Sequence, residues 1–180
     1  MIDFKKPELS DKKAVDVCLE SNICRTCDYS FANIYAWQIK FKTTFSVFNE
    51  TLFLQFEDEQ GNHSYMMPVG KMPLKKSIKL IMEDAEKHGK PFQMKGVTCA
   101  MWDTISELFP NQFEMIHDAT NDEYLYRSEK LISLSGKKLQ SKRNHINRFQ
   151  RENPDWEYMS LSAPNDLALC FDLLKEWSEE

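Results

Sequence analysis

The sequence predicts an α/β (α+β) protein in which a mixed sheet is flanked by helices. Two kinds of hydrophobic spacing alternate along its 180 residues. Thr44–Phe48 and Leu52–Phe56 are short apolar runs between turn-forming residues, which is typical of strands. Leu74–His88 instead repeats apolar residues every three or four positions, which is typical of an amphipathic helix. With 42% apolar and 12% aromatic residues, the chain can form a hydrophobic core.

Charge is distributed unevenly along the chain. There are 28 acidic residues against 23 Lys and Arg, and the formal net charge is −5. The protein as a whole is therefore not expected to bind nucleic acid nonspecifically. The stretch Lys130–Arg151 is the exception, because it contains seven of the 23 basic residues and neither Asp nor Glu. Any binding of anions is expected to be local to this stretch.

The composition also bears on compartment and on metal binding. No apolar run reaches the ~18 residues that would span a membrane, and the N-terminus lacks the apolar region of a signal peptide. Five cysteines without a disulfide-type spacing favour a reduced, cytoplasmic protein. Cys24 and Cys27 form a single CxxC, and a zinc site would need a second pair of ligands. We therefore expect no metal site and favour structural or incidental cysteines over a redox role.

The first forty residues predict a short edge strand and two helices. The edge strand is Met1–Lys5, and the first helix runs from a cap at Ser10 to Leu19. The second helix is Ser30–Phe41, and its apolar residues follow near-helical spacing. We interpret this aromatic stripe as core rather than as a ligand cage. The stripe consists of Phe31, Ile34, Tyr35 and Ile39, with Trp37 beside it.

The middle of the chain predicts a three-stranded antiparallel meander followed by alternating helices and strands. The turn-rich separators are Asn49-Glu50 and residues 58–62. Gly89 is expected to end the helix that begins at Leu74, and Pro110 to end the next one. The predicted strands are Thr44–Phe48, Leu52–Phe56, Ser64–Val69, Pro91–Lys95, Gln112–His117 and Glu123–Arg127, and the helices are Leu74–His88 and Thr98–Phe109. The acidic turn between the last two strands is interpreted as a solvated loop.

The basic stretch predicts a helix that begins at Ser135 or Gly136 and ends before Pro154. At about 100° per residue, its apolar residues share one narrow face and would anchor the helix. These anchors are Leu139, Ile146 and Phe149. The cations on the other sides are predicted to bind a phosphate-bearing ligand: Lys137, Lys138, Lys142, Arg143, His145 and Arg148. The alternatives are a solvated charged face or ion pairs with carboxylates elsewhere in the fold.

The last part of the chain predicts a strand, Trp156–Leu161, and a helix capped by Ser162 or Asn165. A strand and helix in this position indicate the beginning of a further unit. We therefore predict three parts: residues 1–128 as a first domain, residues 129–154 as a basic connecting helix, and residues 155–180 as the beginning of a second unit.

The order of these elements resembles the GNAT acyltransferase fold up to about Arg127, and the final strand and helix resemble its first two steps again. Three stretches carry a closer resemblance: SFANIYAWQIKF, MMPVGK and DEYLYRSEKLISLSGKKLQSKRNHINRFQRENPDWEY. They resemble motifs of a bacterial family related to the C-terminal domain of phosphatidylglycerol lysyltransferases, which in turn is related to the Fem-type aminoacyltransferases. In these relatives GNAT-like units occur in tandem.

The resemblance implies the N-terminal part of an aminoacyl or acyl transferase, with a phosphate-bearing substrate such as aminoacyl-tRNA near the basic helix. GNAT acetyltransferases hold coenzyme A with a Q/R-x-x-G-x-G/A loop, whereas PVGKMPLKKSI has one glycine at that position. No acyl-CoA cofactor is therefore expected, and the resemblance transfers no catalytic residue. We expect this chain alone to be inactive. The alternative function is a non-catalytic GNAT-like domain that docks an anionic partner, either nucleic acid or protein.

Overall fold

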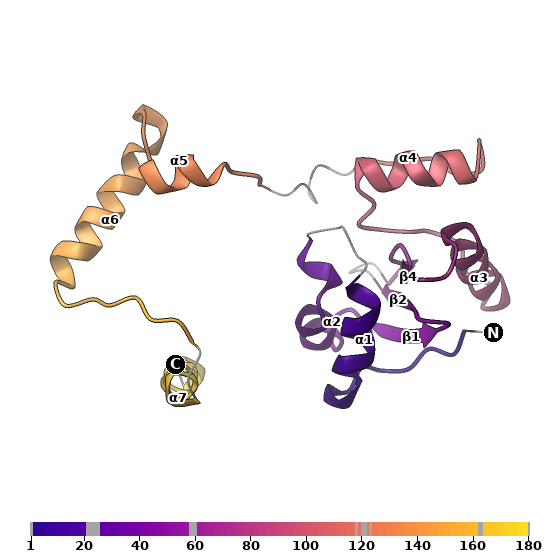
Figure 1. Ribbon diagram of the computed structural model, residues 1–180, viewed down its shortest axis with the longest axis horizontal. Coiled ribbons are helices and arrows are strands. Elements are labelled where there is room, and N and C mark those ends of the chain that lie inside the picture. Colours follow the sequence, from indigo (N-terminus) through magenta and orange to yellow (C-terminus); the bar gives the residue numbers. More distant parts are fainter. Residues whose placement is uncertain are drawn as a thin grey trace. The chain divides into compact units, whose positions relative to one another are not determined.

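The computed structural model describes residues 2–20, 26–57, 61–117, 119, 122, 124–161 and 164–179. The chain forms two compact units, Met1–His117 (unit 1) and Asp118–Glu180 (unit 2). Unit 1 contains an antiparallel sheet and helices, and the described part of unit 2 contains helices joined by irregular segments (Figure 1). The α+β class is thereby confirmed. The predicted boundaries after residues 128 and 154 stay a prediction.

The sheet is centred on one strand. Its members are β1 (Thr44–Phe48), β2 (Thr51–Glu57), β3 (His63–Tyr65) and β4 (Val69–Gly70). β2 pairs with β1 on one side and with β3 and β4 on the other, all antiparallel. This confirms the predicted meander, although its third strand is interrupted between β3 and β4. Pro68 lies in that interruption, and a proline has no N–H to donate to a ladder.

Two further segments each join the sheet through one residue. Lys5 bridges Phe45 of β1 in antiparallel fashion, and each backbone N–H donates to the other's carbonyl at 2.9 Å. Met94 bridges Tyr65 in parallel fashion, and the Tyr65 carbonyl accepts from the N–H of Lys95 at 3.0 Å. The predicted strands at the N-terminus and at 91–95 are thus reduced to single bridges, of which the second runs parallel.

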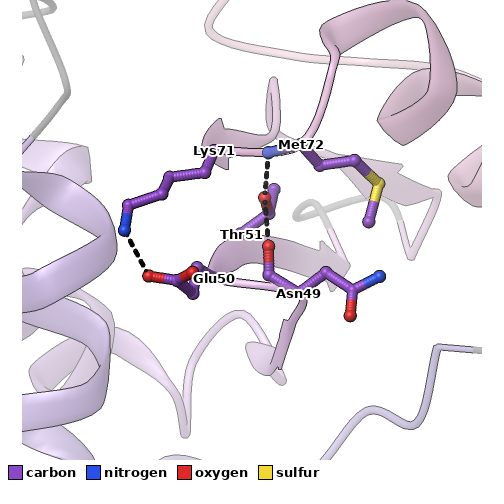
Figure 2. A network of polar contacts seen from close by, with 5 residues as sticks. All are labelled: Asn49, Glu50, Thr51, Lys71 and Met72. Carbon is purple, nitrogen blue, oxygen red and sulfur yellow. Dashed lines mark hydrogen bonds and ion pairs between the residues drawn. The ribbon is translucent and has the colours of Figure 1, made fainter.

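A polar network ties the β1–β2 turn to the chain that enters the following helix (Figure 2). Asn49 and Glu50 have φ values of 48° and 54°, as a two-residue type I′ turn requires. The buried Thr51 hydroxyl accepts from the N–H of Met72 at 2.9 Å and donates to the Asn49 carbonyl at 3.2 Å. The ammonium of Lys71 pairs with the Glu50 carboxylate. The turn and the start of the helix therefore hold each other in place.

Gly70 is required by this arrangement. Its φ is +148°, and a Cβ built there would lie 2.2 Å from the Glu50 carbonyl oxygen and 2.5 Å from Thr51 Cα. Only glycine permits such a close approach between two backbones. The stretch MMPVGK therefore has a structural explanation, in which Gly70 allows the approach and Lys71 pairs across it.

The helices begin and end where local chemistry favours it. Ser30 caps α2 by accepting from the N–H of Asn33 at 3.2 Å, and Thr98 caps α4 by accepting from that of Met101 at 3.3 Å. Gly89, with φ +62°, follows α3 in a left-handed conformation. The α-helices are α1 (Lys12–Leu19), α2 (Phe31–Trp37), α3 (Leu74–Lys87), α4 (Cys99–Leu108), α5 (Ser128–Ser133), α6 (Gln140–Glu152) and α7 (Pro164–Glu179), and the 3-10 turns are η1 (Leu9–Asp11), η2 (Cys27–Tyr29) and η4 (Lys137–Leu139).

Both faces of the sheet in unit 1 are buried, with α1 and α2 on one face and α3 on the other (Figure 1). The first core contains Val15, Cys18, Phe31, Ile34, Phe45, Leu52 and Leu54, and the second contains Ile2, Phe53, Tyr65, Met72, Ile81 and Ala85. α4 packs beside α3 through Ile78, Ile105 and Phe109. Burial raises the pKa of the Cys18 thiol, as expected for a cysteine in an apolar core.

Several predicted elements in unit 1 need correction. Ser10 lies inside η1 and does not cap α1, whose N-cap residue is Asp11. The Asp11 carboxylate accepts from the N–H of Glu8 at 2.9 Å and so caps η1. α2 ends at Trp37, so the helical spacing does not continue to Ile39, whose side chain is 90% exposed. Tyr35 is also exposed, which leaves Phe31 and Ile34 as the buried residues of that stripe.

The predicted strands at 112–117, 123–127 and 156–161 are wrong where the structure describes these residues, because none of them lies in a strand. Alternating apolar residues form a strand only when a partner strand supplies hydrogen bonds. Tyr124 and Leu125 are 87% and 98% exposed, so no second layer covers them. α7 begins at Pro164, so Asn165 does not cap it, and Ser162 lies outside the described residues.

Candidate anion-binding surface

The basic stretch of unit 2 folds as two helices joined by a tight elbow rather than as one helix. α5 ends because Leu134 adopts a left-handed conformation with φ 46°, and its N–H donates to the Lys130 carbonyl at 2.9 Å. Gly136 then turns the chain at φ 90° and precedes η4, which leads directly into α6. The predicted start at Ser135 or Gly136 therefore holds only for η4, because α6 itself begins at Gln140. The predicted end before Pro154 is confirmed, since α6 ends at Glu152.

Most of the predicted cations on this elbow have no acidic partner. In the part of unit 2 that the structure describes, no carboxylate pairs with Lys137, Lys138, Lys142 or His145, and all of them are exposed. Arg148 differs, since its Nε lies 2.8 Å from a carboxylate oxygen of Glu152 one turn later. An exposed pair of this kind contributes little to stability.

Arg143 has a different environment from the other cations. It is half-buried, whereas the others are exposed. Its Nη1 donates to the carbonyl oxygens of Leu134 and Gly136, the latter at 3.0 Å, and its Nη2 donates to the side-chain oxygen of Gln140. Arg143, predicted as part of the phosphate site, is thus already engaged within the elbow.

The unpaired cations form a row that continues into an aromatic pair. At about 100° per residue, Lys142 and His145 fall within one narrow sector of α6, and Lys138 of η4 precedes Lys142 by four residues. Phe149, predicted to lie on the apolar face, follows in this sector instead and is 51% exposed; its ring packs edge-on against that of Trp156 with centroids 6.1 Å apart. Each pair of like charges one helical turn apart lowers the stability of a helix by about 0.2–0.5 kcal/mol. The row is chemically able to hold phosphates beside an exposed aromatic surface.

The predicted anchors of the basic helix are not buried within unit 2. Ile146 is 46% exposed and Phe149 is 51% exposed, while Leu139 is half-buried. Apart from the Trp156 ring, no ring contact involves these side chains among the residues described. The role of these residues as anchors on a larger body stays a prediction.

The CxxC pair and the acidic turn, which we do not expect to be functional sites, are only partly described by the structure. Cys27 is exposed, and Cys24 lies outside the described residues. Asp118 and Glu123 of the acidic turn also lie outside them. Among the residues that are described, no group of three or more His, Cys, Asp or Glu side chains could hold a metal ion.

The sequence reasoning missed a polar cluster in the core of unit 1. The fully buried Tyr65 hydroxyl donates to the Asp84 carboxylate at 2.6 Å, and His88 Nδ1 lies 3.6 Å from the same carboxylate. Burial and the hydrogen bond to Asp84 raise the pKa of Tyr65. The ring of His63 packs edge-on against that of Tyr65, with ring centroids 5.0 Å apart. Burial lowers the pKa of His63. Because Tyr65 has no exposed surface, we interpret the cluster as a cross-link between β3 and α3.

Comparison with known proteins places this geometry in a family. The family described as "Phosphatidylglycerol lysyltransferase, C-terminal" matches residues 24–180. The chain belongs to this family. The match includes α2, the sheet, the elbow and the basic row, so the site lies within the family domain. No curated protein matches the chain.

A solved structure also resembles this member of the lysyltransferase-related family. It is the crystal structure of a conserved protein of unknown function from Bacteroides thetaiotaomicron VPI-5482, 36% identical, with a TM-score of 0.78. The match covers 99% of this chain and 60% of that chain, so the chain spans about three-fifths of the solved protein's length. Among the helices that the structure describes, none combines the length and apolar character needed to cross a membrane.

Proposed function

We propose that the chain is the N-terminal part of an aminoacyl or acyl transferase, and that the row on the elbow binds a phosphate-bearing substrate such as aminoacyl-tRNA. The observation that carries the proposal is the row of basic side chains Lys138, Lys142 and His145, none paired with a carboxylate among the described residues, in a chain of net charge −5. Membership of a lysyltransferase-related family supports transfer as the reaction class. Such transfer relies mainly on positioning the reactants and stabilising an oxyanion.

The proposal does not include coenzyme A as the acyl donor. In the GNAT acetyltransferases the pyrophosphate meets free backbone N–H groups ahead of the helix that corresponds to α3. In this chain the N–H of Met72 donates to Thr51, Pro73 has no N–H, and Lys71 pairs with Glu50 (Figure 2). The polar groups just before α3 therefore already bind the β1–β2 turn and are not free to bind a pyrophosphate. This supports an acyl donor other than acyl-CoA.

A binding assay with tRNA tests the proposal. We expect fluorescently labelled, aminoacylated tRNA to bind the protein at low salt and to dissociate steeply as salt rises. Each phosphate contact contributes a slope of about −0.9 in log K against log [salt] for a duplex. Lys138→Ala with Lys142→Ala should reduce both the affinity and the slope, measured by fluorescence anisotropy.

A matched control separates local binding from general charge. Lys76 and Lys79 are exposed cations on α3, so Lys76→Ala with Lys79→Ala removes the same charge from unit 1. The proposal expects this control to bind like the parent protein. It fails if both double variants lose affinity equally, or if the parent protein does not bind tRNA at low salt while the substitutions on α6 lower the melting temperature.

The alternative function is a non-catalytic domain that docks an anionic partner through the same row. Both functions predict that the row binds an anionic partner, but only the transferase is expected to catalyse a transfer reaction. The family description suggests the assay: transfer of labelled lysine from lysyl-tRNA to phosphatidylglycerol vesicles. Transfer by the full native protein, lost in the Lys138→Ala, Lys142→Ala variant, supports the transferase. Binding of tRNA without transfer to any lipid or amine acceptor supports the docking domain.

A further inference from the structure

We propose that Arg143 is a positioning residue that fixes the elbow between α5 and α6, rather than one of the cations that bind the ligand. The proposal concerns the same surface and rests on the proposed function for its ligand-binding readout. The role of Arg143 in the elbow can be tested in the ligand-free protein by amide hydrogen exchange. Without Arg143, the predicted ligand-binding set consists of the exposed basic side chains Lys137, Lys138, Lys142, His145 and Arg148.

The guanidinium reaches oxygens from both sides of the elbow. Both N–H groups of Nη1 are used, one on the Leu134 carbonyl at the end of α5 and one on the Gly136 carbonyl in the turn. Nη2 donates to the Gln140 side chain at the start of α6. Three of the five N–H groups of the guanidinium are therefore engaged within the elbow, and the fork between Nη1 and Nη2 is occupied.

The Leu134 carbonyl at the end of α5 needs this donor, whereas the Gly136 carbonyl also accepts from the N–H of Leu139 at 3.3 Å. The last carbonyls of a helix have no partner within it, and they carry the negative end of the helix dipole. α5 ends in the left-handed residue Leu134, a conformation that is unfavourable for a non-glycine residue. A planar cation placed on the Leu134 carbonyl offsets this cost. Arg143 is half-buried there, which is consistent with a structural contact.

The contact is extended by a second amide. The Gln140 side-chain oxygen accepts from Arg143, and its amide nitrogen donates to the side-chain oxygen of Asn144 at 2.9 Å. Both ends of the Gln140 amide are thus satisfied, so its orientation is fixed. The segment LSGKKLQSKRN therefore contains one local hydrogen-bond network. The carbonyl oxygens of Leu134 and Gly136 accept in it, and the guanidinium of Arg143 donates to both.

An exchange of Arg and Lys at neighbouring positions tests the proposal. Arg143→Lys keeps the charge but loses the planar fork, and a point charge cannot satisfy three oxygens in the same way. Lys142→Arg, the matched control, keeps the charge at an exposed position. We expect hydrogen exchange at the amides of Leu134 and Leu139 to be at least about tenfold faster in Arg143→Lys and unchanged in Lys142→Arg, because hydrogen bonds from charged groups contribute more than one factor of ten.

Ligand binding gives the readout that a merely structural role would not move. We expect Arg143→Lys and Arg143→Gln to weaken tRNA binding alike, with the salt slope of the parent protein retained. If Arg143 is instead a phosphate contact, Arg143→Lys restores binding, Arg143→Gln reduces the slope by about 0.9, and amide exchange stays unchanged. These results would overturn the proposal. Absence of tRNA binding by the parent protein would refute the proposed function alone, because the exchange experiment still decides the role of Arg143.

Discussion

Unit 1 and unit 2 contain similar apolar residues and bury them very differently. In unit 1, Phe53 has no exposed surface because α3 covers its face of the sheet, and Ile78 has none because α3 packs beside α4. In unit 2, Phe171 and Trp177 of α7 are 62% and 69% exposed. The described helices of unit 2 are instead held by local contacts, such as the Asn153 side chain on the Phe149 carbonyl at 3.0 Å. A hydrophobic pattern thus predicts which side of a helix or strand is apolar. Whether that side is buried depends on another element that packs against it.

The largest expected difference between the units comes from deleting a large apolar side chain. Phe53→Ala should lower the free energy of unfolding by about 3–5 kcal/mol, since it removes a fully buried ring and leaves a cavity. Phe171→Ala should change it by no more than about 0.5 kcal/mol, as expected for an exposed position. Urea unfolding followed by circular dichroism checks both. A comparable loss from Phe171→Ala would indicate that α7 is buried in solution.

One glycine in each unit allows the cost of an added side chain to be compared between the two backbones. Gly70 and Gly136 both have positive φ, but only Gly70 has backbone atoms within reach of an added Cβ. Gly136→Ala should cost about 1 kcal/mol for the conformation alone, and Gly70→Ala should cost clearly more, about 3 kcal/mol. Thermal unfolding of both variants measures the difference. Equal losses would mean that the β1–β2 turn moves aside without cost.

The smallest expected effect concerns one hydroxyl group in each unit. Tyr65→Phe leaves the buried Asp84 carboxylate without its partner at 2.6 Å and should cost about 1–3 kcal/mol. Tyr158→Phe removes a hydroxyl from a side chain that is 89% exposed and should be neutral within about 0.5 kcal/mol. Chemical denaturation at neutral pH compares them. If both variants behave like the parent protein, the cross-link between β3 and α3 does not contribute to stability.

The parts of the fold that could be predicted from the sequence are those in which one local pattern decides the outcome. The strand at Thr44–Phe48 has the predicted bounds, because turn residues follow it directly. The helix α3 ends at Lys87, one residue before its predicted end, with Gly89 just beyond it. In such cases the residues that start or stop an element are its immediate neighbours in the chain.

The parts that could not be predicted depend on partners distant in sequence or space. The alternating residues Tyr124 and Tyr126 have the spacing of a strand, but alternation does not reveal whether a second strand pairs with them. A charge run likewise cannot distinguish Lys142, which is exposed, from Arg143, whose partners include the carbonyl of Leu134 nine residues earlier. The cationic row was therefore predictable as a group, and the division of roles within it was not.

The bridge between Lys5 and Phe45 matters for how the protein behaves in concentrated solution. β1 is an outer strand, and an unpaired strand edge is a template on which other chains can add. The backbone of Lys5 occupies the outward N–H and carbonyl of Phe45, and its ammonium lies 5.4 Å from the centre of the Phe45 ring. Pro7 follows, with no N–H to extend the ladder. The N-terminal segment thus covers the backbone of Phe45 at the edge of the sheet. Removal of the first five residues would leave that N–H and carbonyl open to pairing with another chain.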